Sequence, residues 1–98
     1  MKFNIIYSNK ARQQIGLLRV DKSLEKRYKS VIKTIALMSV DLRHPSLNTH
    51  EFSSLSKRLG IKVFESYAEN NTPGAYRVFW VYAERQGDIE IIAITPHP

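Results

Sequence analysis

The sequence predicts one α+β domain spanning residues 1–98, in the order β-α-α-β-β-β, with a helical hairpin packed on a mostly antiparallel four-stranded sheet. Two observations support this prediction. After a short first strand, apolar residues recur with helical spacing up to about residue 40. In the second half of the chain, β-branched and aromatic residues form short runs that are separated by turn-forming clusters. Helices and strands that are segregated along the chain in this way are typical of α+β domains.

The clearest strand pattern lies in residues 75–84. Its odd-numbered and even-numbered positions are both largely apolar or aromatic, as expected for a central strand that is covered on both faces. Residues 85–88 supply a tight turn, in which Gly87 can adopt a positive φ. Residues 89–95 then return as a second strand, and residues 61–69 form the strand before the central one.

The first half of the chain predicts a strand at residues 2–7 and two helices. Ser8 is a suitable N-cap for the first helix, and Asp21 can cap a second helix that runs to about Val40. The second helix has an apolar face, which we expect to be buried against the sheet: Leu24, Tyr28, Val31, Ile32, Ile35 and Met38. In the connection over residues 41–60, Pro45 and Gly60 argue against a continuous element.

One charged residue interrupts the apolar pattern of the central strand. Arg77 shares a face with Phe79 and Val81, so its charge must find a partner or lie in an open groove. An ion pair with Glu65 or Glu90 would satisfy it within the fold. A ligand with a negative charge would instead make it a functional residue, and we treat Arg77 as the first candidate.

The charge balance points to a polyanionic or acidic partner. The formal net charge is +6, and no cysteine is present for a disulfide or a thiolate metal site. No apolar run is long enough for a signal peptide or a membrane span, which predicts a cytoplasmic protein without a membrane partner. Four lysines lie close together on the outer side of the second helix, either as a solvated face or as a binding stripe: Lys22, Lys26, Lys29 and Lys33.

The order of elements, the basic charge and the segments GAYRVFW and IEIIAITPHP resemble the RelE/ParE superfamily of bacterial toxins. The resemblance covers nearly the whole chain. It implies a protein partner, an antitoxin encoded in the same operon, for which the lysine stripe is the candidate surface. It also implies one of two activities, because RelE- and HigB-like members cleave mRNA on the ribosome, whereas ParE-like members inhibit DNA gyrase.

Within this resemblance, Arg77 matches the arginine that contacts the scissile phosphate, and His97 matches the basic or histidine position after the last strand. The chain departs from RelE in two respects. Only Lys62 is basic on the strand before the arginine, and the chain ends at Pro98 without the C-terminal tyrosine of RelE. A leaner, histidine-centred site of the HigB type therefore fits better.

RNA cleavage without a metal or cofactor requires a base, a cation for the developing phosphorane and an acid for the leaving oxygen. Arg77 can supply the cation, and His97 the acid or base, since histidine titrates near neutral pH. His50 and Tyr82 are further candidates for proton transfer. Two histidines without a third ligand at metal spacing do not predict a zinc site. Four basic residues are candidates for binding RNA: Lys57, Arg58, Lys62 and Arg43.

The leading prediction is thus a ribosome-dependent mRNA endonuclease. The alternatives are a ParE-like gyrase inhibitor and a degenerate toxin that only binds its antitoxin. The position of the 85–88 turn predicts that Arg77 faces roughly Pro96 across the last two strands. His97 would then lie within reach of Arg77.

Overall fold

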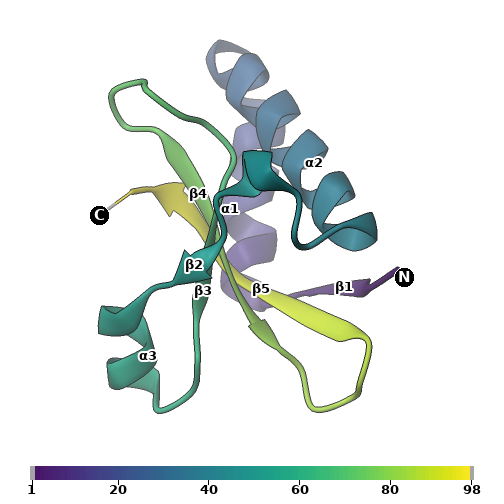
Figure 1. Cartoon of the computed structure of the whole chain (residues 1–98). Coiled ribbons are helices and arrows are strands. Elements are labelled where there is room, and N and C mark those ends of the chain that lie inside the picture. Colours follow the sequence, from purple (N-terminus) through teal and green to yellow (C-terminus); the bar gives the residue numbers. More distant parts are fainter. Residues whose placement is uncertain (1, 98) are drawn as a thin grey trace.

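The computed structural model describes residues 2–97 and confirms an α+β fold that is built on one sheet (Figure 1). Its strands lie in the order β1-β5-β4-β3-β2. The elements are β1 (Asn4–Tyr7), α1 (Asn9–Val20), α2 (Glu25–Val40), β2 (His50–Glu51), α3 (Ser53–Leu59), β3 (Phe64–Tyr67), β4 (Tyr76–Tyr82) and β5 (Asp88–Pro96), with 3-10 turns at Lys22–Leu24 and Pro45–Leu47.

The sheet has five strands rather than the predicted four. The additional strand, β2, has only two residues and pairs antiparallel with β3 at one edge. At the opposite edge β1 pairs with β5 in parallel, while the β3–β4 and β4–β5 pairs are antiparallel. A two-residue strand has no alternation of its own that a sequence pattern could reveal, so its pairing is decided by the tertiary fold.

The helical hairpin covers one face of the sheet. Ser8 caps α1 as predicted, because its Oγ accepts a hydrogen bond from the Ala11 amide at 3.0 Å. The α-helical part of the second helix begins at Glu25, later than predicted, because Asp21 caps the 3-10 turn instead. The core on this face combines residues of both helices, the sheet and the following loop: Ala11, Leu18, Val31, Ile35, Met38, Leu47, Val78, Trp80, Ile89, Ile91 and Ile94.

The predicted apolar face of α2 is buried at its centre but not at every position. Val31, Ile35 and Met38 are buried, and Leu24 and Tyr28 pack at the margin of the core. Ile32 is 39% exposed, so the expectation that it is buried was wrong. The sheet contacts only the central stripe of the helix, and a residue one position from Val31 is turned about 100° away from that stripe.

The other face of the sheet is partly covered by α3, a helix that was not predicted within the 41–60 connection. Phe52 and Leu55 pack against a second, smaller apolar cluster of Val63, Phe79 and Val81. Gly60 ends α3 with a φ of +74°, a left-handed conformation that glycine adopts without strain. In Figure 1, α3 lies on the side of the sheet that faces away from α1 and α2.

The alignment of β4 with β5 differs from the predicted one by one residue. Arg77 faces Thr95, not Pro96, and an irregularity between Phe79 and Trp80 shifts the register within the ladder. Such a bulge cannot be derived from the position of a turn. His97 continues the ladder beyond β5, since its amide donates to the Ala75 carbonyl at 2.9 Å. Residues two apart along a strand share a face, so this alignment places His97 on the face of Arg77.

Candidate functional site

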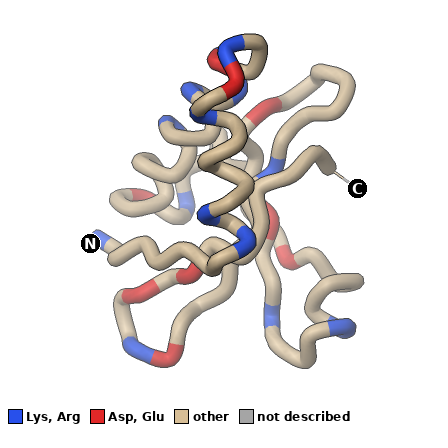
Figure 2. Tube along the Cα trace, turned by 180° about the vertical axis from the view of Figure 1, so that it is seen from behind, with Lys and Arg blue, Asp and Glu red and all other residues tan. Residues whose placement is uncertain are grey.

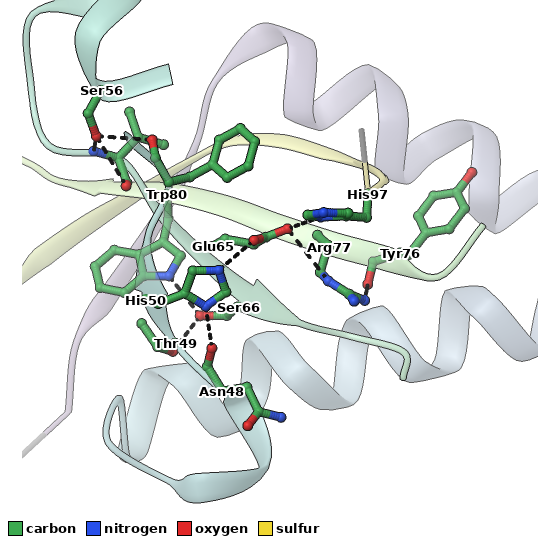
Figure 3. A network of polar contacts seen from close by, with 12 residues as sticks. Asn48, Thr49, His50, Ser56, Glu65, Ser66, Tyr76, Arg77, Trp80 and His97 are labelled. Atoms are coloured by element: carbon green, nitrogen blue, oxygen red, sulfur yellow. Dashed lines mark hydrogen bonds and ion pairs between the residues drawn. The ribbon is translucent and has the colours of Figure 1, made fainter. Parts of the chain in front are cut away.

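A fully buried carboxylate lies on the sheet face that points away from the helical hairpin. Glu65 of β3 is 0% exposed, and a carboxylate in such a place requires positively charged or hydrogen-bonding partners. Three side chains converge on it (Figure 3). His97 Nδ1 lies 2.6 Å from Oε2, His50 Nε2 lies 2.8 Å from Oε1, and Arg77 Nε lies 3.5 Å from Oε2.

The sheet brings these four residues together from four different strands or strand ends. His50 pairs directly with Glu65 across the β2–β3 ladder. Arg77 pairs with Tyr67, which lies two residues beyond Glu65 on the same face, so the two charged side chains are diagonal neighbours. His97 follows Pro96, the last residue of β5. The cluster therefore depends on the strand order and on the register of three ladders.

The two histidines differ in the nitrogen that is left for proton transfer. His97 contacts Glu65 through Nδ1, so Nδ1–H faces the carboxylate and Nε2 remains available. In His50, Nε2 faces Glu65 while Nδ1 lies 2.8 Å from the Asn48 carbonyl oxygen, so both of its nitrogens already face acceptors. The side chains of His50 and His97 are 48% and 47% exposed, so both rings form a solvent-accessible layer above the buried carboxylate.

The cluster retains unused hydrogen-bonding capacity. Among the described residues, Glu65 Oε1 and Arg77 Nε have no hydrogen-bond partner of good geometry. Each nevertheless lies within ion-pair distance of another side chain: Glu65 Oε1 of His50 Nε2, and Arg77 Nε of Glu65 Oε2. The contact between His50 and Glu65 is therefore short but lacks the geometry of a hydrogen bond. Unsatisfied buried polar atoms are rare in proteins and are concentrated at sites of function or strain.

Arg77 is held firmly by the protein. It is only 7% exposed, and its Nη1 donates to the carbonyl oxygens of Glu69 and Tyr76. Its Cζ lies 3.6 Å from the centre of the Tyr67 ring, which is a close cation–π contact. Of the two ion pairs expected from the sequence, the structure forms the one with Glu65. Arg77 thus supplies positive charge beneath the histidines rather than an extended, mobile arm.

Tyr82, the fourth catalytic candidate, does not join the cluster. It lies near the end of β4 on the hairpin side of the sheet, where its ring meets Phe64 and Trp80 edge-on. Trp80 is buried and donates its indole N–H to Ser66 Oγ at 2.9 Å, so it serves the core.

The predicted RNA-binding residues separate into two groups. Lys57 and Arg58 lie in the last turn of α3 and Lys62 follows it, all exposed. Arg43 is also exposed but lies after α2, beside a cavity on the hairpin side.

The basic residues are spread over the molecule rather than gathered on one face (Figure 2). The four lysines of the predicted stripe are all exposed, as a binding role requires: Lys22, Lys26, Lys29 and Lys33. Lys29 makes one ion pair with Glu25, at 3.9 Å. None of the helices within residues 2–97 is long and apolar enough to cross a membrane.

Glu65 is the residue of this site that the sequence analysis did not select as functional. It was considered only as an ion-pair partner of Arg77. A signal was present, because Glu65 lies between Val63 and Tyr67 on one face of its strand and interrupts their apolar and aromatic pattern with a charge. Within the described residues, no group of three His, Asp or Glu side chains is arranged to hold a metal ion.

No protein-family model and no curated protein matches this sequence. Solved structures do match over nearly the full length of both chains. The YoeB dimer from Staphylococcus aureus aligns with a TM-score of 0.66 at 13% identity, covering 100% of each chain. The archaeal RelE–RelB complex from Pyrococcus horikoshii OT3 gives 0.63 at 9% identity, covering 98% of this chain and 96% of the other.

A YoeB/ParE toxin from Agrobacterium tumefaciens aligns with a TM-score of 0.67 at 7% identity, covering 98% of this chain and 100% of the other. These identities are low, so the likeness concerns the backbone fold. It agrees with the resemblance that the sequence segments indicated. The chain has the fold of the RelE/ParE toxin superfamily.

Proposed function

We propose that this protein is the cytoplasmic toxin of a type II toxin–antitoxin pair and that it cleaves mRNA on the ribosome by using side chains alone. The observation that supports this proposal most directly is the cluster around Glu65. Two half-exposed histidines contact the two oxygens of one buried carboxylate, and an arginine lies beside them. This arrangement contains the proton-transfer groups and the positive charge that phosphodiester cleavage requires.

In the proposed reaction the 2′-OH of the RNA attacks the adjacent phosphorus and the 5′-oxygen of the next nucleotide leaves. The products are a 2′,3′-cyclic phosphate and a 5′-hydroxyl. His97 accepts the proton of the 2′-OH at Nε2, because its other nitrogen is held by Glu65. Glu65 fixes the orientation of the ring and stabilises the imidazolium that forms, as the carboxylate of a catalytic triad does.

Arg77 and His50 have supporting roles in this proposal. Arg77 balances the charge of Glu65 and adds positive potential beneath the phosphate. His50 protonates the leaving oxygen after it gives up its contact with the Asn48 carbonyl. Lys57, Arg58 and Lys62 lie on the side of the sheet that carries α3, where they can bind phosphates that flank the cleaved bond.

The same proposal includes an antitoxin as the protein partner. One structural neighbour, the archaeal RelE, was solved in complex with RelB. The net charge of +6 and the exposed lysine stripe, which begins in the turn before α2 and continues along α2, favour an acidic partner segment.

The test is a cell-free translation reaction with one defined mRNA, with and without ribosomes, in which cleaved ends are mapped and examined for 2′,3′-cyclic phosphates. His97→Asn places an amide near the position of Nδ1, so it can still donate to Glu65 but cannot transfer a proton. It should therefore fold normally and lose cleavage by about 10²–10⁴-fold, the usual contribution of a general acid or base. Glu65→Gln is the second test variant. Its charge-matched control is Glu84→Gln, because Glu84 is an exposed acid in the β4–β5 turn.

Two results would assign a different function to the protein. Intact mRNA together with inhibition of supercoiling by purified gyrase would identify a ParE-like toxin. Binding to the neighbouring gene product without either activity would identify a degenerate toxin. Undiminished cleavage by His97→Asn and Glu65→Gln would keep the nuclease but move its active site away from this cluster.

A further inference from the structure

A cavity on the hairpin side of the sheet lies apart from the Glu65 cluster. Its volume is about 670 Å³, within the range of roughly 300–1,000 Å³ that is usual for sites of small ligands. It lies between the segment that follows α2 and the aromatic residues of β3 and β4. Of its lining residues, only Asn48 enters the proposed cleavage mechanism, through the carbonyl oxygen that His50 contacts.

Aromatic side chains form one wall of this cavity. Phe64 stacks on Trp80 with ring centres 4.8 Å apart, and Tyr82 meets both rings edge-on. Tyr82 is 59% exposed, although the five residues before it in β4 are buried. An exposed aromatic ring that is braced by two others is a suitable surface for stacking a nucleobase, since all bases have a planar face.

The polar residues of the cavity favour a base over a phosphate. Asp41 and Arg43 both line it, so their charges are balanced and an anionic group gains little there. Asp41 Oδ1 accepts a hydrogen bond from the Arg43 amide at 3.2 Å, which leaves its other oxygen to accept from a ligand. Guanine carries two adjacent N–H donors on its Watson–Crick edge, which a carboxylate can accept, whereas adenine and uracil do not.

One lining residue of this cavity also contacts the Glu65 cluster, because the Asn48 carbonyl oxygen lies 2.8 Å from His50 Nδ1. Trp80 donates to Ser66, and Ser66 Oγ lies 2.7 Å from the hydroxyl of Thr49, another lining residue. Ser66 follows Glu65 in the chain, and Thr49 precedes His50. Consecutive residues therefore belong to the two different sites, which lie on opposite faces of β3. The edge of the sheet at β2 separates them. A single strand of RNA that crosses this edge can reach both sites.

We infer that this cavity binds one base of single-stranded RNA, with guanine preferred, and thereby contributes base recognition. The choice of RNA as the ligand rests on the proposed function. The base stacks on Tyr82 and offers its hydrogen-bond donors to Asp41, while Arg43 remains at the rim.

The inference can be tested with mononucleotides, which contain no cleavable bond. Binding of GMP, AMP, CMP and UMP is measured by calorimetry and by NMR, and the fluorescence of the single tryptophan, which is Trp80, gives a further readout. Tyr82→Ala should weaken GMP at least about fivefold, the lower limit of a base–aromatic stack, whereas Tyr82→Phe should retain binding. Asp41→Asn should reduce the preference for GMP over AMP. Asp21→Asn is its matched control, because Asp21 caps a turn in the same way at the far end of the hairpin.

The outcomes separate this inference from the proposed nuclease. Saturable GMP binding that depends on Tyr82 and Asp41 supports the inference even if the protein cleaves no RNA. Three results would overturn it: no nucleotide binds, binding is indifferent to Tyr82→Ala, or the NMR shifts lie only around the Glu65 cluster. Cleavage activity without nucleotide binding at the cavity would preserve the nuclease and reject the base site. Binding of a peptide but of no nucleotide would assign the cavity to a protein partner.

Discussion

Replacing Arg77 by methionine removes the guanidinium that lies 3.5 Å from the buried carboxylate of Glu65 and leaves a side chain that can fill part of the same space. Removing one member of a buried ion pair typically costs about 3–5 kcal/mol, because the other charge stays buried without its partner. Glu65 is fully buried and Arg77 nearly so, which makes this range the appropriate one. For a chain of this size, the midpoint of thermal unfolding should fall by more than roughly 10 °C.

The measurement is a double-mutant cycle with Arg77→Met, Glu65→Gln and the combined variant. Urea unfolding can be followed by the fluorescence of Trp80, which is buried in the folded state. All variants are measured at the same pH, because His50 and His97 also contact Glu65. The double variant should be more stable than Arg77→Met alone, with an interaction energy of about 1–3 kcal/mol between the two sites.

An interaction energy near zero would refute the reasoning, because it would mean that the two side chains do not sense each other in the folded protein. A second result would also count against it. If Arg77→Met were as stable as the parent protein, Arg77 would not be the group that stabilises the buried side chain of Glu65.

Three further predictions concern the fold. Gly87 has a φ of +90°, so Gly87→Ala should lower the free energy of unfolding in urea by about 1–2 kcal/mol. Gly16 lies inside α1 with open space around it, so Gly16→Ala should raise the free energy of unfolding by about 0.5–1 kcal/mol. Met38→Ala should cost about 2–5 kcal/mol because Met38 is buried in the core, whereas Val40→Ala, at an exposed position nearby, should change stability by less than about 0.5 kcal/mol. Burial raises the pKa of Tyr7 above its usual value of 10.0, so the associated stability is present at lower pH and is lost as the pH rises above 10. Tyr7→Phe should lose less stability between pH 9 and pH 11 than the parent protein does.

Local patterns in the sequence determined much of the fold. The two-sided apolar alternation over residues 75–84 identified the central strand and its faces, and the structure places Val78 and Trp80 in one core cluster and Phe79 and Val81 in the other. A strand or a helix imposes its period on neighbouring residues, so these features are visible without knowledge of the partner elements. Arg77 was recognised as unusual for the same reason, since it interrupts a local pattern.

The tertiary structure alone decided how the site is assembled. Glu65 and His50 meet because a two-residue strand pairs with β3, and His97 reaches the same carboxylate because a shift in the β4–β5 register moves the alignment by one residue. The parallel pairing of β1 with β5 is likewise a long-range choice. Contacts between residues 15 and 32 positions apart depend on strand order and register, which no local periodicity encodes. The sequence therefore predicted Arg77, His50 and His97 as candidates, and the sheet brought them together around Glu65, which local patterns had not singled out.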